Sequence, residues 1–194
     1  MHTRLTLVCA GATAATRAAA FPRDEPLEPR ALSAASELAK HVRLSGRLWA
    51  APSLAARQTA AFLSPDIGEE EALADWNCGR WAGRKLAEVQ ETEPEAMARW
   101  LSEPDAAPHG GESLAALHGR VTSWLDGRNG SERRIVAVTH AAVIRSAIIA
   151  ILDAPLGSFW LLDVQPLSIT ELSGDGKRWR IRRFGAGWGA ARST

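Results

Sequence analysis

The sequence predicts an α/β fold in which a mainly parallel sheet lies between two layers of helices, as a three-layer sandwich. Strand-like and helix-like segments alternate along most of the chain, which is typical of parallel strands joined by helices. Residues 135–139 form a continuous apolar run rich in β-branched side chains, which indicates a strand covered on both faces. The chain has 194 residues, of which 46% are hydrophobic, so we expect residues 1–194 to form a single domain.

The first predicted element is a buried strand at Thr3–Cys9. The chain from Met1 to Ala20 has an early basic residue and an apolar stretch, a pattern that superficially resembles a secretory signal. Its continuous apolar part is shorter than the roughly 7 to 15 residues of a signal core, and Arg17 follows soon after. No other run approaches the roughly 18 apolar residues of a membrane span. We therefore expect a strand here and no membrane partner.

The two cysteines, Cys9 and Cys78, lie far apart and belong to no Cys-x-x-Cys pair. Such spacing indicates neither a disulfide framework nor a zinc site. We therefore expect a cytoplasmic protein in a reducing compartment, with no metal or other cofactor.

The next elements are predicted from helical periodicity and from helix boundaries. Apolar side chains recur at helical spacing in three segments, at residues 30–42, 94–101 and 112–125. Residues 47–51 are predicted as a short strand. Ser53 is predicted as the N-cap of a helix that runs to Leu63 and ends before Pro65.

The C-terminal half continues the alternation. A helix at Ala141–Leu152 is predicted directly after the strand at residues 135–139, with His140 at the turn between them. Three further strands are predicted, at residues 160–164, 168–173 and 178–184. The Gly-Asp-Gly stretch at residues 174–176 marks a hairpin turn between the last two.

Residues 177–183 combine basic side chains with an aromatic one, a composition found in nucleic-acid-binding segments. Trp179 and Ile181 alternate with arginines, however, as expected for a half-buried strand with a solvated basic face. The chain has 23 basic and 22 acidic side chains and a formal net charge of +1, so no global field attracts nucleic acid or an anionic membrane. We expect no nucleic-acid partner.

Ligands of folds of this class bind at the carboxyl ends of the parallel strands. Two strand ends therefore matter most, the stretch that follows Cys9 and the turn at His140. A histidine between a buried strand and a helix N-terminus points into the crevice and can donate a hydrogen bond to an anion. The alternative for His140 is a loop histidine held only by structural hydrogen bonds.

Several segments, in the correct order and across nearly the whole chain, resemble the histidine phosphatase (phosphoglycerate mutase-like) superfamily. Residues 7–13 resemble its opening strand and Arg-His-Gly-Glu-Thr signature, with Gly11 and Thr13 intact. Residues 51–60 resemble its Ser-Pro-Leu-x-Arg-Ala-x-Gln-Thr-Ala stretch, and residues 139–145 resemble its Ser/Thr-His-Gly-Gly-Val-Ile-Arg stretch. Weaker matches lie at residues 26–27, 73–75, 79–83 and 110–113. The resemblance implies a phosphoglycerate mutase-like α/β fold.

The resemblance also implies a degenerate active site. The histidine that attacks phosphorus in the family corresponds to Ala10, and the two phosphate-clamping arginines correspond to Cys9 and Ala55. His140 matches the family's second histidine, and Asp75 stands at the position of its general acid. An arginine–phosphate contact contributes about 1.5 to 3 kcal/mol, so the loss of two weakens anion affinity by roughly a hundred-fold to ten-thousand-fold.

Other side chains are candidates for the missing roles. Arg57 lies two residues beyond Ala55, a rotation of about 200° on a helix, which points it away from the site. Arg17 is the better candidate for phosphate binding, because its loop is expected to return near the pocket. The Cys9 thiol is a candidate nucleophile, but its spacing from Arg17 differs from that of cysteine phosphatases, and a buried inert cysteine is the alternative.

Three hypotheses from different classes follow. The first is a histidine phosphatase-like protein that is catalytically impaired or binds a ligand without turnover, the ligand being a small phosphorylated or other anionic molecule. The second is a phosphomonoester phosphatase, which is a hydrolase, or a mutase, with a non-standard site around His140, Asp75, Arg17 and Cys9. The third is an interaction module that uses the basic late strand.

Overall fold

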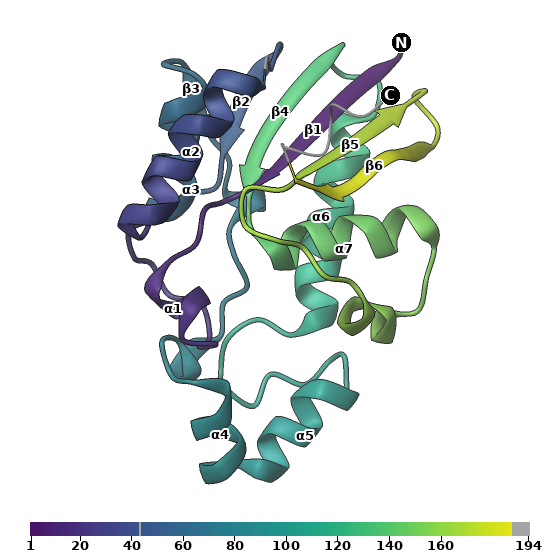
Figure 1. The fold of residues 1–194 in the computed structure, drawn as a ribbon. Helices are drawn as coiled ribbons and strands as arrows, with labels where there is room; N and C mark the ends of the chain where they lie inside the picture. The colour runs from purple at the N-terminus through teal and green to yellow at the C-terminus, as the bar shows by residue number, and fades with distance from the viewer. Residues whose placement is uncertain (43, 188–194) are drawn as a thin grey trace.

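The computed structural model describes residues 1–42 and 44–187, and its central feature is a mixed six-stranded sheet (Figure 1). The strand order is β3-β2-β4-β1-β5-β6. The strands are β1 (Thr3–Cys9), β2 (Arg47–Ala50), β3 (Ile67–Glu69), β4 (Arg134–Thr139), β5 (Ile169–Gly174) and β6 (Trp179–Ala186). The first four run parallel, and β5 and β6 are antiparallel to their neighbours. The expected mainly parallel sheet is confirmed, with an antiparallel hairpin added at one edge.

The two central strands fix the position of the site. β1 pairs with β4 from Arg4 opposite Arg134 to Cys9 opposite Thr139, so both strands end at the same edge of the sheet. Residues 135–139 are all buried, as expected for a strand with helices over both of its faces.

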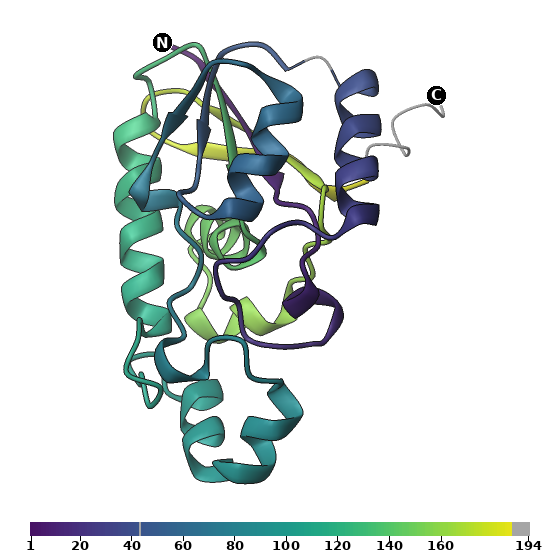
Figure 2. The same ribbon diagram turned by 90° about the vertical axis from the view of Figure 1, so that its left-hand side faces the viewer.

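Four helices cover the sheet, α2 (Pro29–His41), α3 (Leu54–Leu63), α6 (Leu114–Arg128) and α7 (Ala141–Leu152). α2 and α3 pack together on one face, and α6 and α7 pack together on the other (Figures 1 and 2). The α/β sandwich with helices on both faces is therefore confirmed. Ser53 caps α3 as predicted, because its Oγ accepts a hydrogen bond from the Ala56 amide at 3.2 Å.

A second group of helices extends beyond the carboxyl edge of the sheet, where Figure 1 shows α4 (Leu86–Thr92) and α5 (Pro94–Ser102) below the strands. Two single-turn helices, η1 (Glu71–Leu73) and η2 (Gly79–Trp81), lie in the segment that leads to them. Phe21 and Trp100 pack ring against ring at 5.3 Å between centroids, which joins this extension to the loop after β1.

The prediction of a strand at residues 160–164 is wrong. A short 3-10 helix of six residues, η3 (Leu156–Leu161), begins before this segment, and no described strand includes it. Within this segment Val164 is buried, whereas Leu161 is 84% exposed, so the run is neither a strand nor a continuous part of the core. A short apolar run does not distinguish a strand from a packed loop by its periodicity.

Five short elements of the described chain were not predicted: α1 (Ala14–Arg17), β3, η1, η2 and α4. The C-terminal hairpin agrees with its prediction, and in β6 the half-buried Trp179 and Ile181 alternate with the exposed Arg180 and Arg182. None of the helices in the described residues is long and apolar enough to cross a membrane.

Candidate active site

A cavity of about 840 Å³ opens at the carboxyl ends of β1 and β4. The structure brings five of the positions singled out from the sequence to its wall: Cys9, Ala10, Ala55, Asp75 and His140. These residues come from four separate segments of the chain, so only the fold places them together. The volume lies within the usual range for small-molecule sites.

Backbone hydrogen bonds hold these segments together at the sheet edge. Ala10 follows β1 and donates its amide hydrogen to the Thr139 carbonyl at 2.7 Å, which places it next to the turn at His140. The Gly11 amide donates to Thr59 Oγ1 at 3.0 Å and so ties the end of β1 to α3. A side chain at position 10 is therefore held close to the His140 turn.

His140 makes two side-chain contacts, one from each ring nitrogen. Its Nδ1 lies 3.2 Å from Asp75 Oδ2, and its Nε2 lies 2.8 Å from Ser53 Oγ. The Trp76 amide donates to the other carboxylate oxygen of Asp75 at 2.8 Å, which fixes the orientation of that carboxylate. The sequence singled out Ser53 only as a helix cap, so its contact with His140 was missed.

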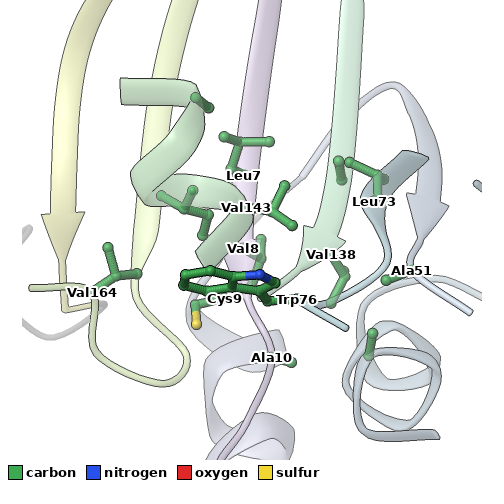
Figure 3. Packing of buried hydrophobic residues seen from close by; sticks show 14 of the residues in the cluster. Leu7, Val8, Cys9, Ala10, Ala51, Leu73, Trp76, Val138, Val143 and Val164 are labelled. Carbon is green, nitrogen blue, oxygen red and sulfur yellow. The ribbon is translucent and has the colours of Figure 1, made fainter. Parts of the chain in front are cut away.

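Neither Cys9 nor Ala10 offers a reactive group. Figure 3 shows both side chains where β1 ends, and each is about 95% buried, with exposed fractions of 4% and 5%. Burial, and to a smaller extent the nearby Asp75 carboxylate, raises the pKa of the Cys9 thiol to about 12. At neutral pH the thiol is protonated and is a poor nucleophile. Ala10 presents only a methyl group.

Arg17 does not line the cavity, contrary to expectation. Its side chain is 74% exposed, and its Nε donates to Glu28 at 2.6 Å, because the single turn of α1 directs it outward. Arg57 also stays outside the cavity and lies 3.5 Å from Glu69, as its rotation on α3 predicts. The two replacement arginines considered from the sequence are thus both paired elsewhere.

The charged groups on the cavity wall are mixed. The described arginines that line it are Arg23 and Arg145, and the aspartates are Asp24, Asp75 and Asp163. Arg23 donates to Glu25 at 2.8 Å, and Arg145 lies 3.9 Å from Asp163. Arg145 was part of the quoted motif but was given no role. Its Nε is buried without a hydrogen-bond partner among the described residues.

The carboxylate of Asp24 adds to the negative charge on the cavity wall and also occupies a backbone donor. It accepts a hydrogen bond from the Leu54 amide at 2.7 Å. Leu54 is the first residue of α3, so a carboxylate already occupies the first amide of that helix. A helix N-terminus is where an external anion would otherwise bind.

An aromatic cluster forms another part of the cavity wall. Its ring centroids lie 4.8 to 5.9 Å apart, and its members are Trp76, Trp100, Phe159 and Trp160. Rings in this arrangement suit an apolar or aromatic ligand group. In the described part of the chain, no group of three His, Cys, Asp or Glu side chains could hold a metal ion.

With this geometry in place, comparisons identify the class of protein. Residues 5–187 match the model of the histidine phosphatase superfamily (branch 1). Phosphoserine phosphatase 1 of Hydrogenobacter thermophilus is 31% identical over 110 residues, which are 55% of this chain and 52% of that protein. Glucosyl-3-phosphoglycerate phosphatase of Mycolicibacterium vanbaalenii is 30% identical over 151 residues, 65% of this chain and 67% of that protein.

A solved structure with a similar fold is a His-to-Ala mutant of phosphoserine phosphatase from Entamoeba histolytica, in complex with phosphoserine. It superposes with a TM-score of 0.85 at 20% identity, over 95% of this chain and 97% of that one. The chain spans about half the length of the Hydrogenobacter relative. The protein belongs to the histidine phosphatase superfamily.

Proposed function

We infer that this protein is a family member that has lost phosphohistidine chemistry and retains its cavity as a ligand-binding site. The observation that carries the proposal is Ala10, which stands at the nucleophile position with only a methyl group in the cavity wall. Covalent catalysis by phosphohistidine needs an imidazole at this point, and no step of that route can begin without it.

The electrostatics of the cavity support the same proposal. Ala55 and the protonated Cys9 stand at the positions of the two clamping arginines, and the described residues on the wall include three aspartates and two arginines. Phosphoryl transfer depends on positive charge placed around the transferring group. A dianionic phosphate monoester would meet unfavourable charge here, and Arg145 is the cation best placed to offset it.

Loss of a histidine need not abolish binding in this fold. The phosphoserine phosphatase mutant from Entamoeba histolytica carries alanine in place of a histidine and was solved with phosphoserine bound. A small phosphorylated or other anionic ligand is therefore compatible with the proposal, as is a less charged one.

The alternative from the sequence, a phosphatase built on His140, Asp75, Arg17 and Cys9, has less support. Arg17 pairs with Glu28 outside the cavity, and the Cys9 thiol stays protonated at neutral pH. Two of its four groups are thus unsuited to their assigned roles.

The test is incubation of the protein with a generic aryl phosphate. The rate of hydrolysis is measured, and mass spectrometry is used to detect any acid-labile or acid-stable phosphorylated residue. We expect hydrolysis at background and no phosphohistidine. Orthophosphate binding should be weak, and Arg145→Gln should weaken it further. A phosphorylated His140 on a turning-over enzyme would overturn the proposal.

A further inference from the structure

The two contacts of His140 form a chain of three side chains, Ser53, His140 and Asp75. Ser53 Oγ lies 2.8 Å from His140 Nε2, and Asp75 Oδ2 lies 3.2 Å from His140 Nδ1. A serine, a histidine and an aspartate joined through the two ring nitrogens in this order make the triad of serine hydrolases. All three line the cavity.

The direction of the hydrogen bonds fits a nucleophilic serine. The Ala56 amide donates to Ser53 Oγ at 3.2 Å, so the hydroxyl hydrogen is left to be donated to His140. The carboxylate beside Nδ1 favours the tautomer with hydrogen on that nitrogen, which leaves a lone pair on Nε2. His140 can then accept the Ser53 proton, and the Trp76 amide holds Asp75 in place.

Three residues that line the cavity carry backbone amides in the first turn of a helix, the kind of donor that stabilises an oxyanion. Ala141 and Ala142 are the first two residues of α7, and Ala55 is the second of α3. Amides in the first turn of a helix have no intrahelical acceptor. All three residues line the cavity. Such donors stabilise the oxyanion of acyl transfer when they face the reacting carbonyl.

The cavity also indicates the class of substrate. Aspartates outnumber arginines on its wall and Asp24 occupies the first amide of α3, which disfavours a dianionic phosphate. A carboxylic ester is neutral at the reacting carbonyl and needs no cationic clamp. The four-ring aromatic cluster provides an apolar surface for an aryl or alkyl group.

From this arrangement we propose that the protein hydrolyses neutral carboxylic esters with apolar or aromatic groups, with Ser53 as the nucleophile. This activity goes beyond the proposed loss of phosphohistidine chemistry and does not depend on it.

The reaction proceeds in two halves. Ser53 Oγ bonds to the carbonyl carbon while its proton passes to His140 Nε2, and the carbonyl π electrons move to the oxygen facing the amides. On collapse, the bond to the alcohol oxygen breaks, and the imidazolium gives its proton to that oxygen. Water then attacks the acyl-serine, losing one proton to His140. The carboxylic acid departs as Ser53 Oγ takes the proton back.

The experiment measures hydrolysis of 4-nitrophenyl acetate and butyrate, together with labelling by a fluorophosphonate probe located by peptide mass spectrometry. The wild-type protein should be labelled at Ser53. Ser53→Ala and His140→Ala should lower kcat/KM for ester by at least about a hundred-fold. Asp75→Asn should lower kcat more than it raises KM.

A matched control separates catalysis from helix capping. Ser113 caps α6 through the Ala116 amide at 3.1 Å, as Ser53 caps α3, and it does not line the cavity. Ser113→Ala should keep wild-type ester hydrolysis and labelling. Ser53→Asn keeps a capping side chain without a hydroxyl and should be folded but inactive.

The outcomes distinguish this proposal from the preceding one. Equal ester hydrolysis in Ser53→Ala and Ser113→Ala, or a label elsewhere than Ser53, overturns the serine mechanism. Absence of any ester hydrolysis in folded wild-type protein, on both probe esters, also overturns it. Phosphohistidine formation with aryl phosphate overturns the proposed loss of phosphatase chemistry and leaves the ester result to stand separately.

Discussion

Placing histidine at position 10 and arginines at positions 9 and 55, the residues that the family pattern has there, tests which of these groups phosphoryl transfer requires. Two variants are compared, Ala10→His alone and Ala10→His combined with Cys9→Arg and Ala55→Arg. All three positions line the cavity. The first variant supplies a nucleophile beside the His140 turn but leaves the phosphoryl group without cationic partners. Nucleophile and clamp act as a unit, so their effects should be far from additive.

The expected difference follows from the charge of the cavity. Each arginine–phosphate contact contributes about 1.5 to 3 kcal/mol, so two contribute about 3 to 6 kcal/mol, or a hundred-fold to ten-thousand-fold. Some of this gain is offset because Asp24, Asp75 and Asp163 already line the cavity and compete for the new guanidinium groups. The upper part of this range leaves room for that offset, and we expect the triple variant to exceed the single variant by about a hundred-fold.

The assay is steady-state hydrolysis of an aryl phosphate by both variants side by side, with folding checked by circular dichroism and thermal unfolding. Unpaired buried cations could cost several kcal/mol, so the comparison uses only folded preparations. Equal rates in the two variants would mean that another residue already clamps phosphate. An inactive but folded triple variant would mean that lost arginines do not explain the deficit.

Two further predictions concern the thiols and Arg17. Burial raises the pKa of both Cys9 and Cys78 to about 12, above the ordinary value of 9.0. The chain has no tyrosine, so no phenol group titrates in the same pH range. Both thiols thus ionise first in the unfolded chain, and the free energy of unfolding should fall between pH 9 and 12 by about 1.4 kcal/mol per pH unit for each thiol. Urea unfolding across this range measures it, and Cys78→Ala should reduce the slope. Arg17→Ala should leave phosphate binding and ester hydrolysis unchanged within about two-fold, because its exposed pair with Glu28 contributes little; a larger loss would return Arg17 to the site.

Long elements could be predicted from the sequence because their signals are local. β4 is a continuous apolar run, the helix at Ala141–Leu152 that follows it is long and apolar, and Ser53 is a recognisable capping residue at the start of α3. β3 and α1 have three and four residues, too few to show a period. Residues 160–164 belong to the end of η3 and the segment after it, with Val164 buried and Leu161 exposed, and composition alone does not separate that case from a strand.

The residues of the candidate site also fall into those that a local motif could place and those whose position depends on tertiary packing. Cys9, Ala10, Ala55, Asp75 and His140 were placed through motif positions, and the fold brings them to one cavity. Arg17 was placed by an expected loop path, which depends on packing between α1 and Glu28 that the sequence does not encode locally. Arg145 sat inside a recognised motif, but its relation to Asp163 and Phe159 is a long-range contact.

Ser53 shows why a local interpretation of a residue can be correct and incomplete. Its hydroxyl accepts from the Ala56 amide, which satisfies the capping role, and an oxygen that accepts one hydrogen bond still has a proton to donate. The acceptor available to that proton is His140 Nε2, which lies 2.8 Å from Ser53 Oγ although the two residues are 87 positions apart in the chain. A pattern within ten residues identifies the first bond, whereas the second requires the β2-β4 pairing that brings the two strand ends together. The Thr139 hydroxyl donates to the Leu73 carbonyl at 2.7 Å, which holds the segment leading to Asp75 beside the His140 turn. The cavity therefore holds a hydroxyl, an imidazole and a carboxylate in contact with one another. Helix capping by Ser53 does not require the contact between Ser53 and His140 or the contact between His140 and Asp75. These two contacts are the reason to test the site with an ester.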